Sequence, residues 1–170
     1  ADRSLQLVDE HLDLAVRVGA LPDSTLVAVR VASLREVVCA SPAYLATHGT
    51  PRNPQELAGH DCVSFAGPAG GAGWSFGPLR EQRSAPLRAR LVVNTAEAAV
   101  DAAIAGVGLT RVHSYQAAAA VQSGTLSLVL RKFEPAPIPV SLVYTRQALL
   151  PAKLRAFLDF AAPRLKARLA

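Results

Sequence analysis

The chain has 170 residues, of which 51% are hydrophobic and 18% are charged, as in an ordinary globular protein. Its apolar runs are too short to cross a bilayer, and no cationic segment followed by an apolar run opens it, so we expect neither a membrane partner nor a secretory signal. The sequence contains no methionine, which predicts a fragment or a processed product.

The formal net charge of +5 raises the question of nucleic-acid binding. The basic residues are spread singly, however, and the densest group, between Arg80 and Arg90, is interrupted by small and apolar residues. Only 5% of the residues are aromatic, which is poor for stacking on bases. The charge therefore favours a solvated surface over direct contact with nucleic acid.

The first part of the chain is predicted to consist mainly of strands. Leu5–His11 favours a short helix, whereas Leu12–Val18 alternates apolar and polar residues and indicates a strand. Leu26–Leu34 is again alternating and β-branched, and Glu36–Ala40 is typical of a short buried strand. The loop between the first two strands contains proline, aspartate and serine, which favour turns.

A helix is predicted next. Ser41 is suited to the N-cap, and Pro42 fits the first helical position, where a missing N–H costs nothing. The helix covers Ala43–His48 and ends at Gly49. A second short helix begins within Pro54–Leu57.

The middle of the chain is predicted to return to strands, at Cys62–Phe65, Trp74–Phe76 and Leu87–Val93, with Trp74 packed in a core. The glycine-rich loop Gly67–Gly73 has no lysine and no helix after it, so it does not match a phosphate-binding loop.

The last part alternates helices and strands. Asn94 and Thr95 precede a helix with Glu97 in its first turn, where a negative charge is favourable. Gly106 and Gly108 form a tight turn. The predicted elements are a helix at Ala96–Ala105, a strand from Leu109, a helix at His113–Ser123, strands at Leu126–Val129 and Val140–Tyr144, and a helix at Pro151–Leu169. This alternation predicts an α/β fold with mostly parallel sheets.

Catalytic and metal-binding patterns are not found in the sequence. Cys39 and Cys62 stand in separate apolar contexts and are expected to be buried free thiols. The histidines lack the spacing of a metal-binding helix, and no paired-carboxylate motif is present. We therefore expect no enzyme activity, no cofactor and no metal.

Five segments in series resemble the effector-binding domain of LysR-type transcriptional regulators. They are Asp13–Gly19 (DLAVRVG), Leu21–Val31 (LPDSTLVAVRV), Val38–Val63 (beginning VCASPAYL), Asn94–Val112 (NTAEAAVDAAIAGVGLTRV) and Lys153–Leu165 (KLRAFLDFAAPRL). Each segment alone is weak, but together they cover essentially the whole chain in the right order.

The resemblance implies a type II periplasmic-binding-protein-like fold of two α/β lobes with mixed, mostly parallel sheets, joined by two crossovers. Residues 1–31 and 140–170 would form lobe I, residues 38–137 lobe II, and residues 32–37 and 138–144 the hinge crossovers. Family members begin lobe I with a strand, a helix and a second strand that have no counterpart here. DNA would be bound only through a winged helix-turn-helix that is absent from this chain.

The resemblance also implies an open sheet edge. The absent strand would lie beside Leu12–Val18, so this strand should expose one edge, a liability that proteins usually cover. We expect a partner chain in a homo-oligomer, a dimer or tetramer, to fill the edge, or else poor solubility. A well-behaved monomer in sedimentation at high concentration would count against this expectation.

By analogy, the effector would bind between the lobes at strand ends and helix N-termini, where free N–H groups favour anions. The effector would be a small anionic or aromatic metabolite. The ligand-binding candidates are Gly19, Ala20, Leu21, Ser41, Pro42, Asn94, Thr95, Thr110 and Val112.

Simpler roles stay open for several of these residues. Ser41, Asn94 and Thr95 could serve only as helix caps, and Arg17 more often pairs with an acid such as Asp13 than with a ligand. His113 is a further candidate donor in the pocket.

Two other functions share this fold and remain alternatives. One is a solute-binding protein for transport, which would need an export signal, and the other is a dimerisation module that binds no ligand. The regulator interpretation implies a cytoplasmic protein.

Overall fold

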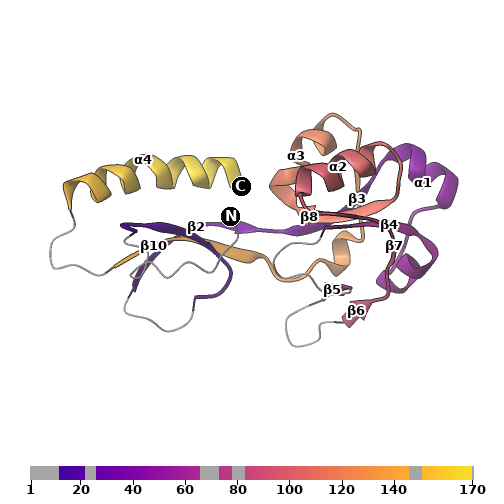
Figure 1. Cartoon of the computed structure of the whole chain (residues 1–170), viewed down its shortest axis with the longest axis horizontal. Coiled ribbons are helices and arrows are strands. Elements are labelled where there is room, and N and C mark those ends of the chain that lie inside the picture. Colours follow the sequence, from indigo (N-terminus) through magenta and orange to yellow (C-terminus); the bar gives the residue numbers. More distant parts are fainter. Residues whose placement is uncertain (1–11, 22–25, 66–72, 78–82, 146–150, 170) are drawn as a thin grey trace. The chain divides into compact units, whose positions relative to one another are not determined.

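The computed structural model describes residues 12–21, 26–65, 73–77, 83–145 and 151–169 (Figure 1). The chain divides into two compact units: residues 1–34 with 137–170 form unit 1, and residues 35–136 form unit 2. The boundaries lie in or beside the segments predicted as crossovers. The predicted helix at Leu5–His11 and most of the loop at Gly67–Gly73 lie outside the described residues.

In its described residues, unit 1 is a three-stranded sheet covered by one helix. The strands are β1 (Ala15–Val18), β2 (Leu26–Leu34) and β10 (Ile138–Thr145), in the order β1-β10-β2, and the helix is α4 (Ala152–Leu169). Leucines and alanines of α4 recur at spacings of three and four, which gives the helix one apolar face. This face packs on the sheet over Val31, Leu34, Val140 and Leu142.

The outer strand β1 is only partly covered. Val16 pairs with Leu142 and Val18 with Val140, so these valines share the sheet face that α4 covers. Even so, Val16 is 53% and Val18 52% exposed, because α4 packs mainly over β2. Within the described residues β1 is thus an edge strand with an apolar surface; what covers it stays a prediction.

Unit 2 is built around a five-stranded sheet of order β7-β4-β8-β3-β9 and a two-stranded sheet of β5 and β6. Its strands are β3 (Glu36–Ala40), β4 (Asp61–Phe65), β5 (Trp74–Phe76), β6 (Arg83–Ala85), β7 (Arg88–Val93), β8 (Leu109–His113) and β9 (Ser127–Val129). Its helices are α1 (Pro42–His48), α2 (Ala96–Ile104) and α3 (Ser114–Gln122), with 3₁₀ turns η1 (Pro54–Gly59) and η2 (Arg131–Phe133).

The strand β3, next to the middle of the five-stranded sheet, separates two cores. Its alternate residues Val37 and Cys39 pack with α2 and α3, whereas Val38 and Ala40 pack with Tyr44, Trp74 and other residues on the opposite face. Figure 1 shows α2 and α3 on one side of this sheet and β5 and β6 on the other. The predicted packing of Trp74 in a core is confirmed, with 7% of its surface exposed.

Arg111 on β8 fastens the β5–β6 hairpin to the central sheet. Its guanidinium donates to the Ser75 backbone carbonyl at 2.9 Å and to the Glu36 carboxylate, and it lies over the Phe76 ring. The Arg111 side chain is only 11% exposed. A single cation thus links three strands that are distant in sequence.

The α/β class with mixed sheets is confirmed, but the prediction that the sheets are mostly parallel is wrong. Only the pairs of β4 with β7 and with β8 are parallel; the other described pairs are antiparallel. In unit 1, β10 returns late in the sequence and inserts between β1 and β2. In unit 2, the chain enters β3 at the edge where β8 ends, with Glu36 opposite His113, so β3 runs antiparallel to β8 and also to β9.

The predicted crossovers are themselves largely regular strand. β2 continues through residues 32–34, and β10 begins at Ile138, where it pairs with Leu34. Most residues of both segments can hydrogen-bond to a neighbouring strand, so the segments stay extended and do not form loops.

Candidate functional site

The strand directions in unit 2 give its sheet two chemically different edges. The strands β4, β7 and β8 run in one direction, and β3 runs in the other. We call the edge where β4, β7 and β8 end the C-terminal edge, and the edge where they begin the N-terminal edge. The chain enters unit 2 at Arg35, immediately before β3 and therefore at the C-terminal edge.

Asn94 and Thr95 lie at the C-terminal edge, between β7 and α2. Thr95 is the N-cap of α2, and its hydroxyl accepts a hydrogen bond from the Ala98 N–H at 3.2 Å. Asn94 and Thr95 are both exposed. Thr95 thus has the capping role that was left open for it, and a ligand contact at Asn94 stays a prediction.

Gly19, Ala20 and Leu21 follow the end of β1 in unit 1. The Gly19 N–H donates to the Pro139 carbonyl at 2.9 Å, and the glycine has a φ of +113°, a conformation that other residues rarely adopt. The segment therefore lies at the edge of the unit 1 sheet where β2 ends and β10 begins.

Ser41 and Pro42 lie at the other edge of unit 2. Ser41 caps α1 by accepting from the Tyr44 N–H at 3.3 Å and is 5% exposed. Its hydroxyl faces Gly106, beyond the C-terminal end of α2, where an added Cβ would lie 3.7 Å away. Within unit 2, the structure thus does not bring Ser41 and Asn94 together.

Thr110 and Val112 face the core that contains α2 and α3. Thr110 is fully buried and its hydroxyl donates to the Val63 carbonyl at 3.1 Å, while Val112 is 4% exposed. Neither side chain therefore lines an open wall in the described structure.

Arg17 does not take the partner suggested from sequence. The Asp13 carboxylate instead accepts from Lys153 Nζ at 2.7 Å, which fastens the start of β1 to α4. Sequence reasoning also missed Arg35 and Glu134, which form a two-bond ion pair at the C-terminal edge. An arginine between two apolar strands was the only available signal, and it does not reveal its partner.

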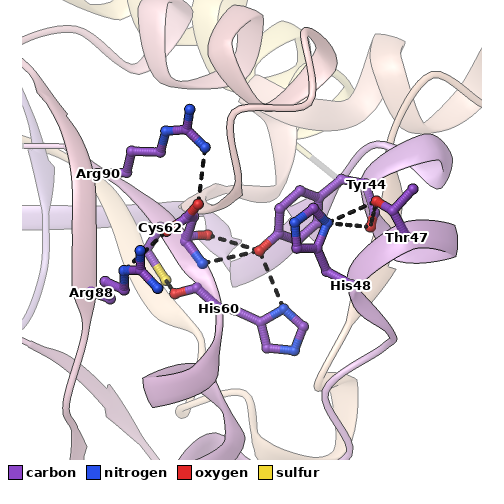
Figure 2. A network of polar contacts seen from close by, with 8 residues as sticks. Tyr44, Thr47, His48, His60, Cys62, Arg88 and Arg90 are labelled. Carbon is purple, nitrogen blue, oxygen red and sulfur yellow. Dashed lines mark hydrogen bonds and ion pairs between the residues drawn. The ribbon is translucent and has the colours of Figure 1, made fainter.

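The N-terminal edge carries a polar network centred on Tyr44 (Figure 2). Tyr44 Oη accepts from the Asp61 N–H at 3.0 Å and lies 3.3 Å from His60 Nδ1. The His48 ring stacks on Tyr44 with centroids 4.3 Å apart. The Asp61 carboxylate pairs with two arginines of β7, Arg88 and Arg90. The network ties α1 to the start of β4 and to β7.

His60 in this network makes stability depend on pH. Burial lowers the pKa of His60 below its ordinary value of 6.5, and His48 adds to the effect, against the opposing charges of Glu56 and Asp61. The unfolded chain therefore takes up a proton at a higher pH than the folded one. Stability should be complete above the unfolded pKa and fall as the pH drops through it.

We therefore expect the free energy of unfolding to decrease between about pH 7.5 and about pH 5.5. The decrease should be smaller in His60→Asn, whose side-chain amide can accept or donate a hydrogen bond but does not titrate. Urea titrations at each pH measure both. Equal decreases in the two proteins would contradict the assignment to His60.

Both cysteines are free and buried, as predicted. Burial raises the pKa of Cys39 to about 12 and that of Cys62 to about 11. The thiols therefore stay protonated near neutral pH and are poor nucleophiles. They pack on opposite faces of the sheet, Cys39 towards α2 and Cys62 towards Tyr44.

The described residues offer hydrogen-bond donors at one helix start. Among them, no group of three or more His, Cys, Asp or Glu side chains lies close enough to hold a metal ion. No described helix is both long and apolar enough to span a membrane. The exposed amide and capped helix start at Asn94 and Thr95 can donate hydrogen bonds to a polar ligand.

Comparison with known proteins identifies the class. Residues 1–166 match the family model of the LysR substrate binding domain. The chain therefore belongs to this family, and the resemblance inferred from five segments is confirmed. Neither the transport protein nor the ligand-free dimerisation module finds support among these matches.

The relatives are regulators with a helix-turn-helix. An HTH-type transcriptional regulator from Xanthomonas campestris pv. campestris (strain 8004) is 34% identical over 168 residues, covering 96% of this chain and 49% of the relative. CrgA from Neisseria meningitidis serogroup B (strain MC58) is 30% identical over 159 residues, covering 92% of this chain and 52% of CrgA. The chain spans about half the length of the curated relatives it matches.

Solved structures agree with this assignment. The CrgA regulatory domain from Neisseria meningitidis matches with a TM-score of 0.78 at 28% identity, over 100% of this chain and 81% of that domain. The regulatory domain of AphB from Vibrio vulnificus matches with a TM-score of 0.78 at 25% identity, over 92% of this chain and 76% of that domain.

Proposed function

We propose that the chain senses a small anionic or aromatic metabolite within a longer cytoplasmic regulator and has no catalytic activity. In this proposal the longer protein is a homo-oligomer that binds DNA through a winged helix-turn-helix outside this chain. Effector binding would select among arrangements of the two units and so alter the regulator on its operator, which requires different affinities for the different arrangements.

The observation that carries the proposal is the position of the exposed pair Asn94 and Thr95. The pair lies at the start of a nine-residue helix, where backbone N–H groups favour an anion, and at the edge by which the chain enters unit 2. In unit 1, Gly19–Leu21 likewise follows a strand at the edge where the chain leaves that unit. We assign effector contacts to these two segments.

The test is a thermal-shift titration with benzoate and with succinate as aromatic and aliphatic carboxylate probes. A ligand that binds only the folded state raises the melting temperature, by an amount that grows with its concentration above the Kd. We expect at least one probe to raise it in the wild-type protein and Asn94→Ala to abolish most of that rise.

Ser41→Ala is the matched control. It removes the cap at the N-terminal edge and should lower the melting temperature itself, because losing a serine N-cap costs about 1 kcal/mol. The rise caused by the probe should nevertheless remain. If neither carboxylate shifts the wild-type protein, the anionic-ligand proposal fails; if Ser41→Ala and Asn94→Ala lose the shift equally, the assignment to the C-terminal edge fails.

A further inference from the structure

The two segments that connect the units are joined to each other by one ion pair. Arg35 is the single residue between β2 and β3, where the chain passes from unit 1 to unit 2. Its Nε and Nη2 donate to the two carboxylate oxygens of Glu134, both at 2.8 Å. Glu134 directly precedes the segment by which the chain returns to unit 1. The pair thus links the outgoing connection to the returning one.

Backbone hydrogen bonds hold each partner of the ion pair in place. The Arg35 carbonyl accepts from the Ser114 N–H at 2.8 Å, which anchors Arg35 to the start of α3. Next to Glu134, the Phe133 N–H donates to Leu130 at 2.9 Å, and the Phe133 carbonyl accepts from Gly77 at 3.0 Å. Both ends of the ion pair are therefore held by structure that belongs to unit 2.

No backbone ladder joins the two connections at this point. They pair at Leu34 and Ile138 in unit 1 and again at Val38 and Val129 in unit 2. Between these two points, within the described chain, no backbone hydrogen bond links them, and the prolines at 135 and 137 have no N–H to donate. The side-chain pair bridges the gap that the backbone leaves.

The two-bond geometry of the Arg35–Glu134 pair orients the two connections more than it stabilises the fold. A two-bond pairing of guanidinium and carboxylate fixes the relative plane of the two groups, which a single charge contact does not. The Glu134 side chain is 14% and the Arg35 side chain 41% exposed, so solvent weakens the net contribution to folding. The hydrogen bond to Glu134 also raises the pKa of Arg35, which keeps the guanidinium charged.

We propose that the Arg35–Glu134 pair is a hinge fastener that makes the two connections bend together and so restricts the arrangements of the units that the free protein samples. Without it, each connection could twist separately. Arg35 and Glu134 would then be positioning residues that act on the effector response without touching the effector. The inference extends the proposed sensing function, but its test requires no ligand.

The experiment measures the distribution of distances between two spin labels by pulsed electron resonance. The labels are attached at Ala118→Cys on α3 and Ala156→Cys on α4, both exposed positions. The native thiols are buried with raised pKa values and need not be removed. Arg35→Glu and Glu134→Arg each place like charges together, and the double variant restores the opposite charges in reversed order.

We expect each single variant to broaden the distribution roughly twofold and the double variant to restore most of the original width, because the restriction comes from the paired charges. Arg90→Glu, which breaks the ion pair of the exposed Arg90 with Asp61 in the same unit, is the matched control and should leave the width unchanged. A purely structural pair would lower the melting temperature without changing the width.

Unchanged widths in the single variants, or a double variant as broad as the singles, would overturn the proposal. If a charge reversal prevents folding, Glu134→Gln gives the same answer, since it keeps the side-chain volume and loses the charge. The labelled protein contains no effector, so the distance measurement tests only the hinge proposal. The carboxylate titration tests only the proposed sensing function, and a negative result in one experiment does not decide the other.

Discussion

Replacing Gly108 with alanine is expected to destabilise the protein by at least about 3 kcal/mol, the upper end of the usual cost of overpacking. Gly108 lies between α2 and β8, against the start of the parallel neighbour β4. A Cβ at this position would lie 2.2 Å from the Asp61 carbonyl oxygen and 2.6 Å from its carbon. Because both atoms are backbone, no side-chain rotation relieves the contact, and β4 or β8 must move.

The urea dependence of unfolding measures this loss, and Gly59→Ala provides the control. Gly59 ends η1, is exposed, and has no atom within 4 Å of an added Cβ. Its replacement should change the free energy of unfolding by less than about 0.5 kcal/mol, as for most surface positions. Similar stabilities of Gly108→Ala and Gly59→Ala would show that β4 and β8 can separate at little cost.

Arg111→Met is expected to cost about 3 kcal/mol, the lower end of the range for removing one partner of a buried ion pair. The substitution keeps most of the unbranched apolar stem of the side chain but leaves the Glu36 carboxylate and the Ser75 carbonyl without their donor. Glu36 is 28% exposed, so water compensates part of the loss. The β5–β6 hairpin should also exchange its amide hydrogens faster, because its attachment to β8 is gone.

A double-mutant cycle with Glu36→Gln separates the pair from general damage. The double variant should lose less than the sum of the two single losses, because the charge left unpaired in Arg111→Met is removed as well. Arg90→Met should cost less than about 1 kcal/mol, because the Arg90 side chain is 63% exposed and Asp61 keeps its second partner, Arg88. Losses that simply add would mean that Arg111 acts through its contacts with Ser75 and Phe76 and not through its pairing with Glu36.

Local signals in the sequence were sufficient for most elements. The Ser41-Pro42 pair predicted the start of α1, and Thr95 predicted the start of α2, because capping depends on residues within one turn. The alternation in β2 predicted its limits of Leu26 and Leu34. The three-residue strand β6 and the turn η2 were missed, since neither is long enough to show a periodicity.

Strand direction could not be predicted in the same way. An alternation of helices and strands in the sequence favours parallel pairing, but β3 and β10 pair with strands far away in the chain. Their direction depends on which way the chain crosses between units, and no local residue pattern records this. Five segments matched to a known family, by contrast, were enough for the class of protein, because order and spacing carry more information than any one motif.

The candidate site was harder to predict for the same reason. Ser41, Thr95 and Thr110 are all hydroxyl residues next to strand ends or within strands, and each makes a bond to backbone. Only the strand directions show that Ser41 lies at the N-terminal edge, Thr95 at the C-terminal edge and Thr110 in the core. Arg35 and Glu134 are 99 residues apart, and their pairing follows from the chain's return to the same edge.

The two edges of the unit 2 sheet are expected to diverge at different rates among descendants of one ancestral gene. At the C-terminal edge, the segment after β7 is short and exposed, so Asn94 can change without disturbing either core. At the N-terminal edge, Tyr44 is bound to backbone of β4, and a substitution there alters the packing of α1. Such a sheet can acquire new ligand preferences at its C-terminal edge while selection preserves the packing at its N-terminal edge.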